Sequence, residues 1–125
     1  ESIKTGNRVI VENNKTTIMA GLNCASVSTL AWDILKNGLS GSMSITDELS
    51  EEAMRLLAYP VSGDPSITSG ESGASGLGGL IGLSKTTKYK DLKDKFNLNK
   101  NSTILIINTE GDTDPTNYKK IINNI

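Results

Sequence analysis

Polar side chains crowd the end of an apolar run near the C-terminus of this 125-residue chain. The run spans residues 102–107, is short and is flanked by turn-forming residues, which predicts a buried strand. In sheets of parallel strands, ligands bind beyond the carboxyl ends of the strands. The residues that follow the run are therefore candidates for ligand binding, and the alternative is a polar turn with an acidic helix cap. They are Asn108, Thr109, Glu110, Gly111, Asp112 and Asp114.

Two of these carboxylates also fit a phosphatase pattern. The run Asp112-Thr-Asp-Pro-Thr116 matches the Asp-x-Asp-x-Thr of acid-loop phosphatases. In those enzymes the first carboxylate is a nucleophile and the second a general acid, beside magnesium. Residues 108–111 separate the motif from its strand, and it lies too late in the chain for the downstream lysine and acidic residues. A magnesium-dependent phosphatase using Asp112 and Asp114 is therefore only an alternative function.

A glycine-rich run spans residues 71–83, with glycine at 73, 76, 79 and 82. Each glycine in a helix costs about 1 kcal/mol relative to alanine. Close approach to a neighbouring backbone or a ligand would offset that cost, because glycine carries no side chain to hold it off. A flexible loop is the alternative. The run lacks the Gly-Lys-Ser/Thr of a P-loop, and no strand precedes it as in the dinucleotide fingerprint.

Composition excludes several classes of function. The net charge of −1 gives no electrostatic footprint for nucleic acid. No apolar segment is long enough to cross a membrane. With no histidine and only Cys24, the chain can form neither an internal disulfide nor a Ser–His or Cys–His pair, and we predict no metal site. The start at Glu1 and the low aromatic content of 4% indicate part of a larger protein.

The elements that must position these residues follow from their patterns. We predict a turn at 13–15, and strands at 8–12, 42–46 and 102–107. We predict helices at 29–36, 48–58, 88–96 and 115–123, and one reading of the glycine run adds another. Together they predict an α/β fold, part of an open, mostly parallel twisted sheet flanked by helices.

Three details of the helices are also predicted. Ser28 and Gly38 would cap the helix at 29–36, whose inward face would carry Leu30, Ile34 and Leu35. Ala53, Leu56 and Leu57 would face inward from the helix at 48–58, which Pro60 would end. Asp114 or Thr116 would cap the last helix, with Pro115 in its first turn.

The order of these segments resembles the C-terminal portion of pyridoxal-phosphate enzymes of the tryptophan-synthase-β and threonine-dehydratase type. Within that superfamily it is most similar to the diaminopropionate ammonia-lyase family. The resemblance covers nearly the whole chain and implies that residues 1–125 are a C-terminal fragment of the large domain. Its motifs are Thr17-Ile-Met-Ala-Gly-Leu-Asn-Cys24, Gly63-Asp-Pro65, Ser69-Gly-Glu-Ser-Gly-Ala74 and Thr109-Glu-Gly-Asp-Thr-Asp114.

The resemblance also implies a reaction and a site. The family eliminates ammonia from 2,3-diaminopropionate to give pyruvate, with the cofactor held by a lysine as a Schiff base and acting as electron sink. The turn after residue 107 would meet the pyridine nitrogen through Thr109, or through Asn108 or Glu110 beside it. Glu71 would lie near another edge of the cofactor.

The same resemblance implies that this chain lacks several catalytic groups of the family. The family's reactive lysine, phosphate loop and acid/base carboxylates lie in its N-terminal part, and no lysine here, such as Lys15 or Lys85, has the matching context. We therefore predict no catalytic residue in this chain and no activity of the chain alone. The complete protein would be a cytoplasmic homodimer acting on a small amino acid, with no nucleic-acid or membrane partner. A non-enzymatic α/β binding module is the other alternative.

Overall fold

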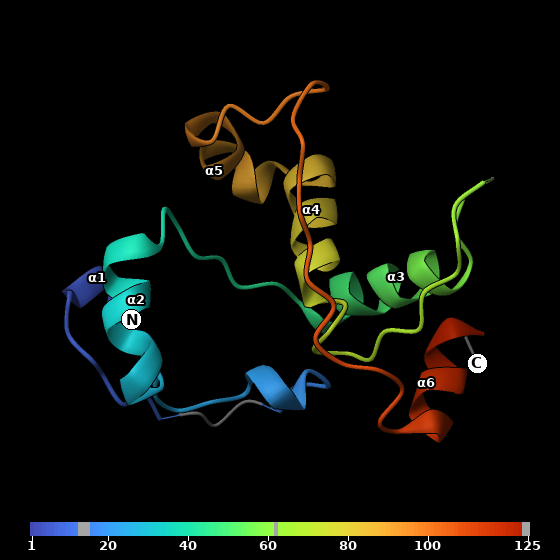
Figure 1. The fold of residues 1–125 in the computed structure, drawn as a ribbon, viewed down its shortest axis with the longest axis horizontal. Helices are drawn as coiled ribbons and strands as arrows, with labels where there is room; N and C mark the ends of the chain where they lie inside the picture. The colour runs from blue at the N-terminus through green and yellow to red at the C-terminus, as the bar shows by residue number, and fades with distance from the viewer. Residues whose placement is uncertain (13–15, 62, 124–125) are drawn as a thin grey trace.

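The computed structural model describes residues 1–12, 16–61 and 63–123 of the chain (Figure 1). The predicted turn at 13–15, which includes Lys15, lies outside the described residues. The described elements are α1 (Ser2–Thr5), a 3₁₀ turn (Ala20–Leu22), α2 (Thr29–Gly38), α3 (Asp47–Ala58), α4 (Ser75–Lys85), a second 3₁₀ turn (Thr87–Tyr89), α5 (Lys90–Lys95) and α6 (Pro115–Ile122).

The predicted α/β sheet is wrong, because no strand forms within residues 1–12, 16–61 and 63–123. The segments at 8–12, 42–46 and 102–107 run without regular structure between the helices (Figure 1). A strand requires a second backbone alongside it to accept and donate its hydrogen bonds. No described backbone pairs with these segments in that way, so their apolar patterns predicted a structure that this chain does not form.

The hydrophobic core lies between α3, α4 and α6 (Figure 1). Ala53 and Met54 of α3 are completely buried, and Ile81 of α4 and Ile121 of α6 close around them. A hydrogen bond reinforces this packing, because the Arg55 guanidinium donates to the Ile121 carbonyl over 3.3 Å. The core therefore fixes the three helices from which the polar segments extend.

The start of α4 packs closely against α3 through glycine. A methyl group at Gly78 would lie 2.9 Å from the carbonyl oxygen of Leu49 and 3.0 Å from Ile45 Cδ1. This confirms that the glycine run forms a helix in close approach to a neighbouring backbone. Gly78 itself lies outside the every-third-residue series from which that approach was predicted.

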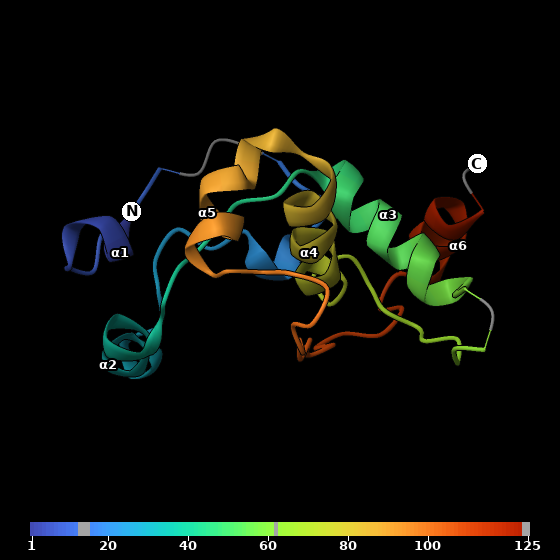
Figure 2. The same ribbon diagram turned by 90° about the horizontal axis from the view of Figure 1, so that it is seen from above.

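Helices α1 and α2 lie apart from this core, as both ribbon views show (Figures 1 and 2). The Ser28 cap is confirmed, because its hydroxyl accepts the Ala31 N–H, although α2 continues through Gly38. The predicted apolar face of α2 is wrong in part. Leu30 is 91% exposed and Ile34 75% exposed, whereas Trp32 is the buried residue of this helix.

The other helix predictions are largely confirmed. In α3, Ala53 is buried and the helix ends before Pro60, but Leu56 is exposed. The helix predicted at 88–96 is a 3₁₀ turn followed by α5. Asp114, not Thr116, caps α6, and its carboxylate accepts two backbone N–H groups.

Candidate functional site

Two polar segments that are distant in sequence lie side by side: the turn at 108–111 and the loop at 69–74. Asn108 joins them through both ends of its amide. Its Oδ1 accepts a hydrogen bond of 2.9 Å from the Ser69 hydroxyl, and its Nδ2 donates one of 3.0 Å to the Thr68 carbonyl. Ser69 is 1% exposed. The side chain of Asn108, the first polar residue after the apolar run, therefore holds the two segments together.

Glu110 makes a second set of bonds between the same segments. Its Oε2 accepts the N–H groups of Ser72 and Gly73 over 2.9 and 3.2 Å. Its Oε1 accepts the Thr113 hydroxyl over 3.0 Å, and its carbonyl accepts the Gly70 N–H over 3.2 Å. Both oxygens of this carboxylate are thus occupied within the chain.

Glycine permits the close approach of the loop to the turn. A methyl group at Gly70 would lie closer than 3.0 Å to the Gly111 carbonyl oxygen. At Gly73 it would lie closer than 3.0 Å to Asn108 Oδ1 and to the Glu110 carbonyl oxygen. Real Cβ atoms do not come this close to backbone atoms, so a side chain at either position would force the segments apart.

A third segment, which begins at Thr17, lies against the same loop. The Gly21 N–H donates to the Ser72 hydroxyl over 3.0 Å. Asp47, the first residue of α3, accepts the Ile18 N–H over 3.2 Å and also the Thr17 hydroxyl. The structure therefore brings together three of the four motifs singled out in the sequence: 17–24, 69–74 and 109–114.

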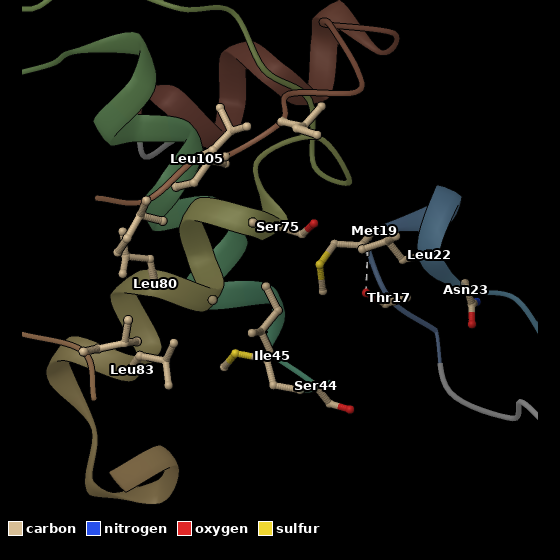
Figure 3. A pocket seen from close by; sticks show the side chains of 17 residues that line it. Thr17, Met19, Leu22, Asn23, Ser44, Ile45, Ser75, Leu80, Leu83 and Leu105 are labelled. Carbon is tan, nitrogen blue, oxygen red and sulfur yellow. Dashed lines mark hydrogen bonds between the residues drawn. The ribbon is translucent and has the colours of Figure 1, made fainter. Parts of the chain in front are cut away.

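A cavity of about 800 Å³ adjoins these segments, next to the start of α4 (Figure 3). Its walls are mostly aliphatic, with hydroxyl and amide groups from a few polar residues. No lysine is among the described residues that line it. They are Thr17, Met19, Leu22, Asn23, Met43, Ser44, Ile45, Ser75, Gly76, Gly79, Leu80, Leu83, Leu98, Ile104, Leu105, Ile106 and Ile107.

Thr109 lies between Asn108 and Glu110 in the sequence, and it is exposed. Its hydroxyl forms no hydrogen bond with any residue that the structure describes. Of the three candidates for a contact to the cofactor ring, Thr109 is therefore the one whose side chain is free, whereas Asn108 and Glu110 already have partners.

Glu71 is hydrogen-bonded to α6 and α3, not to the 108–111 turn. It is 8% exposed, its carboxylate accepts the Asn117 amide of α6 over 2.6 Å, and its carbonyl accepts the Ser50 hydroxyl of α3 over 2.6 Å. Ser50, Asn117 and Asp47 were not among the predicted site residues. Of the three, only Asp47 has a signal in the sequence, because it is an acidic residue next to the start of the helix predicted at 48–58.

The remaining candidates do not gather into a site. The 63–65 motif lies exposed on the loop beyond α3. Asp114 is used as the cap of α6, and Asp112 is exposed. Across the described ranges, no group of three or more His, Cys, Asp or Glu side chains could hold a metal ion. The same ranges contain no helix that is long and apolar enough to cross a membrane.

Comparison with known proteins gives a consistent result. No protein-family model matches the chain. Diaminopropionate ammonia-lyase of Escherichia coli K12 is 41% identical over 117 residues, which are 94% of this chain and 29% of the relative. The enzyme of Salmonella typhimurium LT2 is 39% identical over 113 residues, which are 90% of this chain and 28% of the relative. The chain thus spans less than a third of the length of these relatives.

Solved structures agree with the sequence matches. The E. coli enzyme in complex with an aminoacrylate-PLP azomethine reaction intermediate superposes with a TM-score of 0.82 at 39% identity, covering 97% of this chain and 30% of the other. The apo form of that enzyme gives a TM-score of 0.68 at 40% identity, covering 75% of this chain and 26% of the other. In sequence and in fold, this chain is a homologue of one segment of the diaminopropionate ammonia-lyases.

Proposed function

We propose that this chain is the C-terminal segment of the large domain of a pyridoxal-phosphate-dependent lyase, which eliminates ammonia from 2,3-diaminopropionate to give pyruvate. The 41% identity along 94% of the chain is the observation that carries this proposal. The reaction belongs to the complete protein, which we propose to be a homodimer, and a cytoplasmic location stays a prediction from the sequence.

The donor set of the 108–111 turn suits the cofactor. The exposed Thr109 hydroxyl has no partner among the described residues and can donate to a pyridine nitrogen. When bound, pyridoxal phosphate supplies the electron sink for loss of a proton from the amino acid. A hydroxyl, unlike a carboxylate, leaves that nitrogen unprotonated, so Thr109 would orient the ring without adding charge to it.

The neighbouring candidates take supporting roles in this proposal. Asn108 would reach the ring only by giving up its bonds to Ser69 and Thr68. Glu71 stays a predicted contact, but its carboxylate would first have to leave Asn117. We therefore assign the ring contact to Thr109 and the fixing of the surrounding loops to the other two.

The rest of the catalytic machinery would come from the N-terminal part of the same polypeptide. The cavity beside the site has no lysine among its described lining residues. Aliphatic side chains at one of its walls are open to solvent, with Leu105 87% and Ile107 71% exposed. Such a surface suits cover by another part of the protein, and we propose that the N-terminal part covers it.

The experiment replaces the matching segment of the E. coli enzyme with residues 1–125 of this chain. We expect the hybrid to form pyruvate from 2,3-diaminopropionate only when pyridoxal phosphate is present. Thr109→Ser should keep most of this activity, and Thr109→Val should lose most of it while keeping a measurable rate, at an unchanged fold by circular dichroism. A folded hybrid that binds the cofactor but forms no pyruvate would contradict the proposed reaction.

The claim that this chain lacks the reactive lysine has a separate test. The chain alone is mixed with pyridoxal phosphate, reduced with borohydride and weighed by mass spectrometry. We expect no stoichiometric pyridoxyl-lysine adduct. One adduct per chain on a single lysine would place the reactive group within these 125 residues and overturn the claim.

A further inference from the structure

We propose that Glu110 is a positioning residue, which fixes the main chain of the 108–111 turn so that the side chain of Thr109, and not its own, is presented to the ligand. This inference rests on the proposed function, because it concerns how the same site is built. It assigns to Glu110 a role that its charge alone would not indicate.

The carboxylate of Glu110 behaves as part of the scaffold. It accepts two consecutive backbone N–H groups, those of Ser72 and Gly73, just before α4 begins. A third donor, the Thr113 hydroxyl, lies on its other oxygen. Hydrogen bonds to an ionised acceptor are among the stronger ones in proteins, so three of them give a firm attachment.

The main chain around Glu110 is held as well. Its N–H donates to Asn108 Oδ1 over 3.3 Å, and its carbonyl accepts the Gly70 N–H over 3.2 Å. Bonds thus reach the loop from the residues on both sides of Thr109. The backbone of Thr109 has little freedom left, while its hydroxyl remains without a partner among the described residues.

The carboxylate cannot serve both purposes. To face a ring beyond the turn, Glu110 would have to leave the amides of Ser72 and Gly73 without their acceptor. The geometry therefore separates the two roles: Glu110 determines where the turn lies, and Thr109 provides the group that meets the ligand. Loss of Glu110 should lower activity because Thr109 is then misplaced. A double-mutant cycle measures this dependence of one residue on the other.

The cycle is run in the hybrid enzyme that carries this chain, at saturating pyridoxal phosphate. We expect Glu110→Ala to lower kcat about tenfold or more, since small misplacements of a reacting group have effects of this size. The KM for diaminopropionate should change by less than roughly threefold. In a Thr109→Val background, Glu110→Ala should lower kcat almost no further. In the hybrid that keeps Thr109, Glu110→Gln should lower kcat less than Glu110→Ala does.

Asp112→Ala is the matched control, because Asp112 is an exposed carboxylate in the same stretch. It should leave both constants unchanged. The inference is overturned if Glu110→Ala behaves like Asp112→Ala, or if its effect is fully additive with Thr109→Val. If the unsubstituted hybrid makes no pyruvate, the proposed function fails, and the positioning role is then judged by a measurement that needs no activity.

That measurement is amide hydrogen exchange in the 125-residue chain. In Glu110→Ala, the N–H groups of Ser72 and Gly73 should exchange about tenfold faster or more, because they lose their acceptor. Exchange in Glu110→Gln should be intermediate, and Asp112→Ala should match the unsubstituted chain. Unchanged exchange in Glu110→Ala would show that the carboxylate does not hold the loop, and would overturn the inference.

Discussion

Gly70 and Gly73 allow the two polar segments of the site to touch, and each faces backbone or a fixed amide oxygen. We expect Gly73→Ala to destabilise the chain by about 1–3 kcal/mol, the usual cost of forcing atoms into a well-packed region. The clash is with Asn108 Oδ1 and the Glu110 carbonyl oxygen, neither of which can move without breaking the bonds described above. Urea denaturation measures the change.

Gly111→Ala is the control for that substitution. Gly111 belongs to the same turn, but a methyl group there would meet nothing within 4 Å. Its φ is not positive either, so alanine should be accommodated with a change within about 0.5 kcal/mol. Equal destabilisation by Gly73→Ala and Gly111→Ala would mean that the cost arises from the backbone and not from the close approach.

Among the elements, α4 makes opposite use of two adjacent glycines. Gly78 packs on the Leu49 carbonyl of α3, whereas a methyl group at Gly79 would meet only the flexible Met43 side chain at 3.4 Å. We expect Gly78→Ala to destabilise the chain by about 1–3 kcal/mol by separating the two helices. Gly79→Ala should instead stabilise it by up to about 1 kcal/mol through helix propensity.

Thermal unfolding, followed by circular dichroism, measures the stability of the two variants. Their helix content before unfolding should be equal. A stabilised Gly78→Ala would contradict the packing of α3 on α4. A strongly destabilised Gly79→Ala would show instead that the Met43 side chain cannot move aside.

The elements differ in how well the sequence predicted them, and the reason is the range of the interactions involved. Ser28 and Asp114 cap helices through N–H groups two or three residues away, so a local pattern was enough. The run at 102–107 was predicted to be a buried strand, but that structure depends on a neighbouring backbone, which no local pattern supplies.

The candidate site shows the same dependence on range. Its location after residue 107 was predicted from the change from apolar to polar residues. The role of Glu110 was not predictable in this way, because its partners Ser72 and Gly73 lie 38 and 37 residues earlier in the chain. Glu71 was predicted near the cofactor, and its bond to Asn117 likewise depends on how α6 folds back.

At the scale of the whole molecule, one side carries aliphatic side chains that nothing described covers. Leu105 and Ile107 are its most exposed members among the residues that line the cavity. We expect the isolated chain to self-associate through this side, since exposed apolar patches drive association. Changing both residues to lysine should weaken the association about tenfold or more, given the free energy of burying such side chains. Sedimentation velocity over a range of concentrations measures it.

Ile10→Lys is the control, because Ile10 is also largely exposed but does not line the cavity. It should leave the self-association unchanged. If Ile10→Lys weakens the association as much as the double change does, the contact involves the N-terminal part of the chain and not the 104–107 segment.

The close approach of Gly70 and Gly73 to the 108–111 turn also limits how genes of this kind can recombine. A crossover between codons 74 and 108 joins a loop from one parent to a turn from another. A parent with any side chain at position 70 or 73 could not supply the loop for this turn, however similar the two proteins were elsewhere. In a shuffled library, this turn should therefore survive selection only together with loops that carry glycine at both positions.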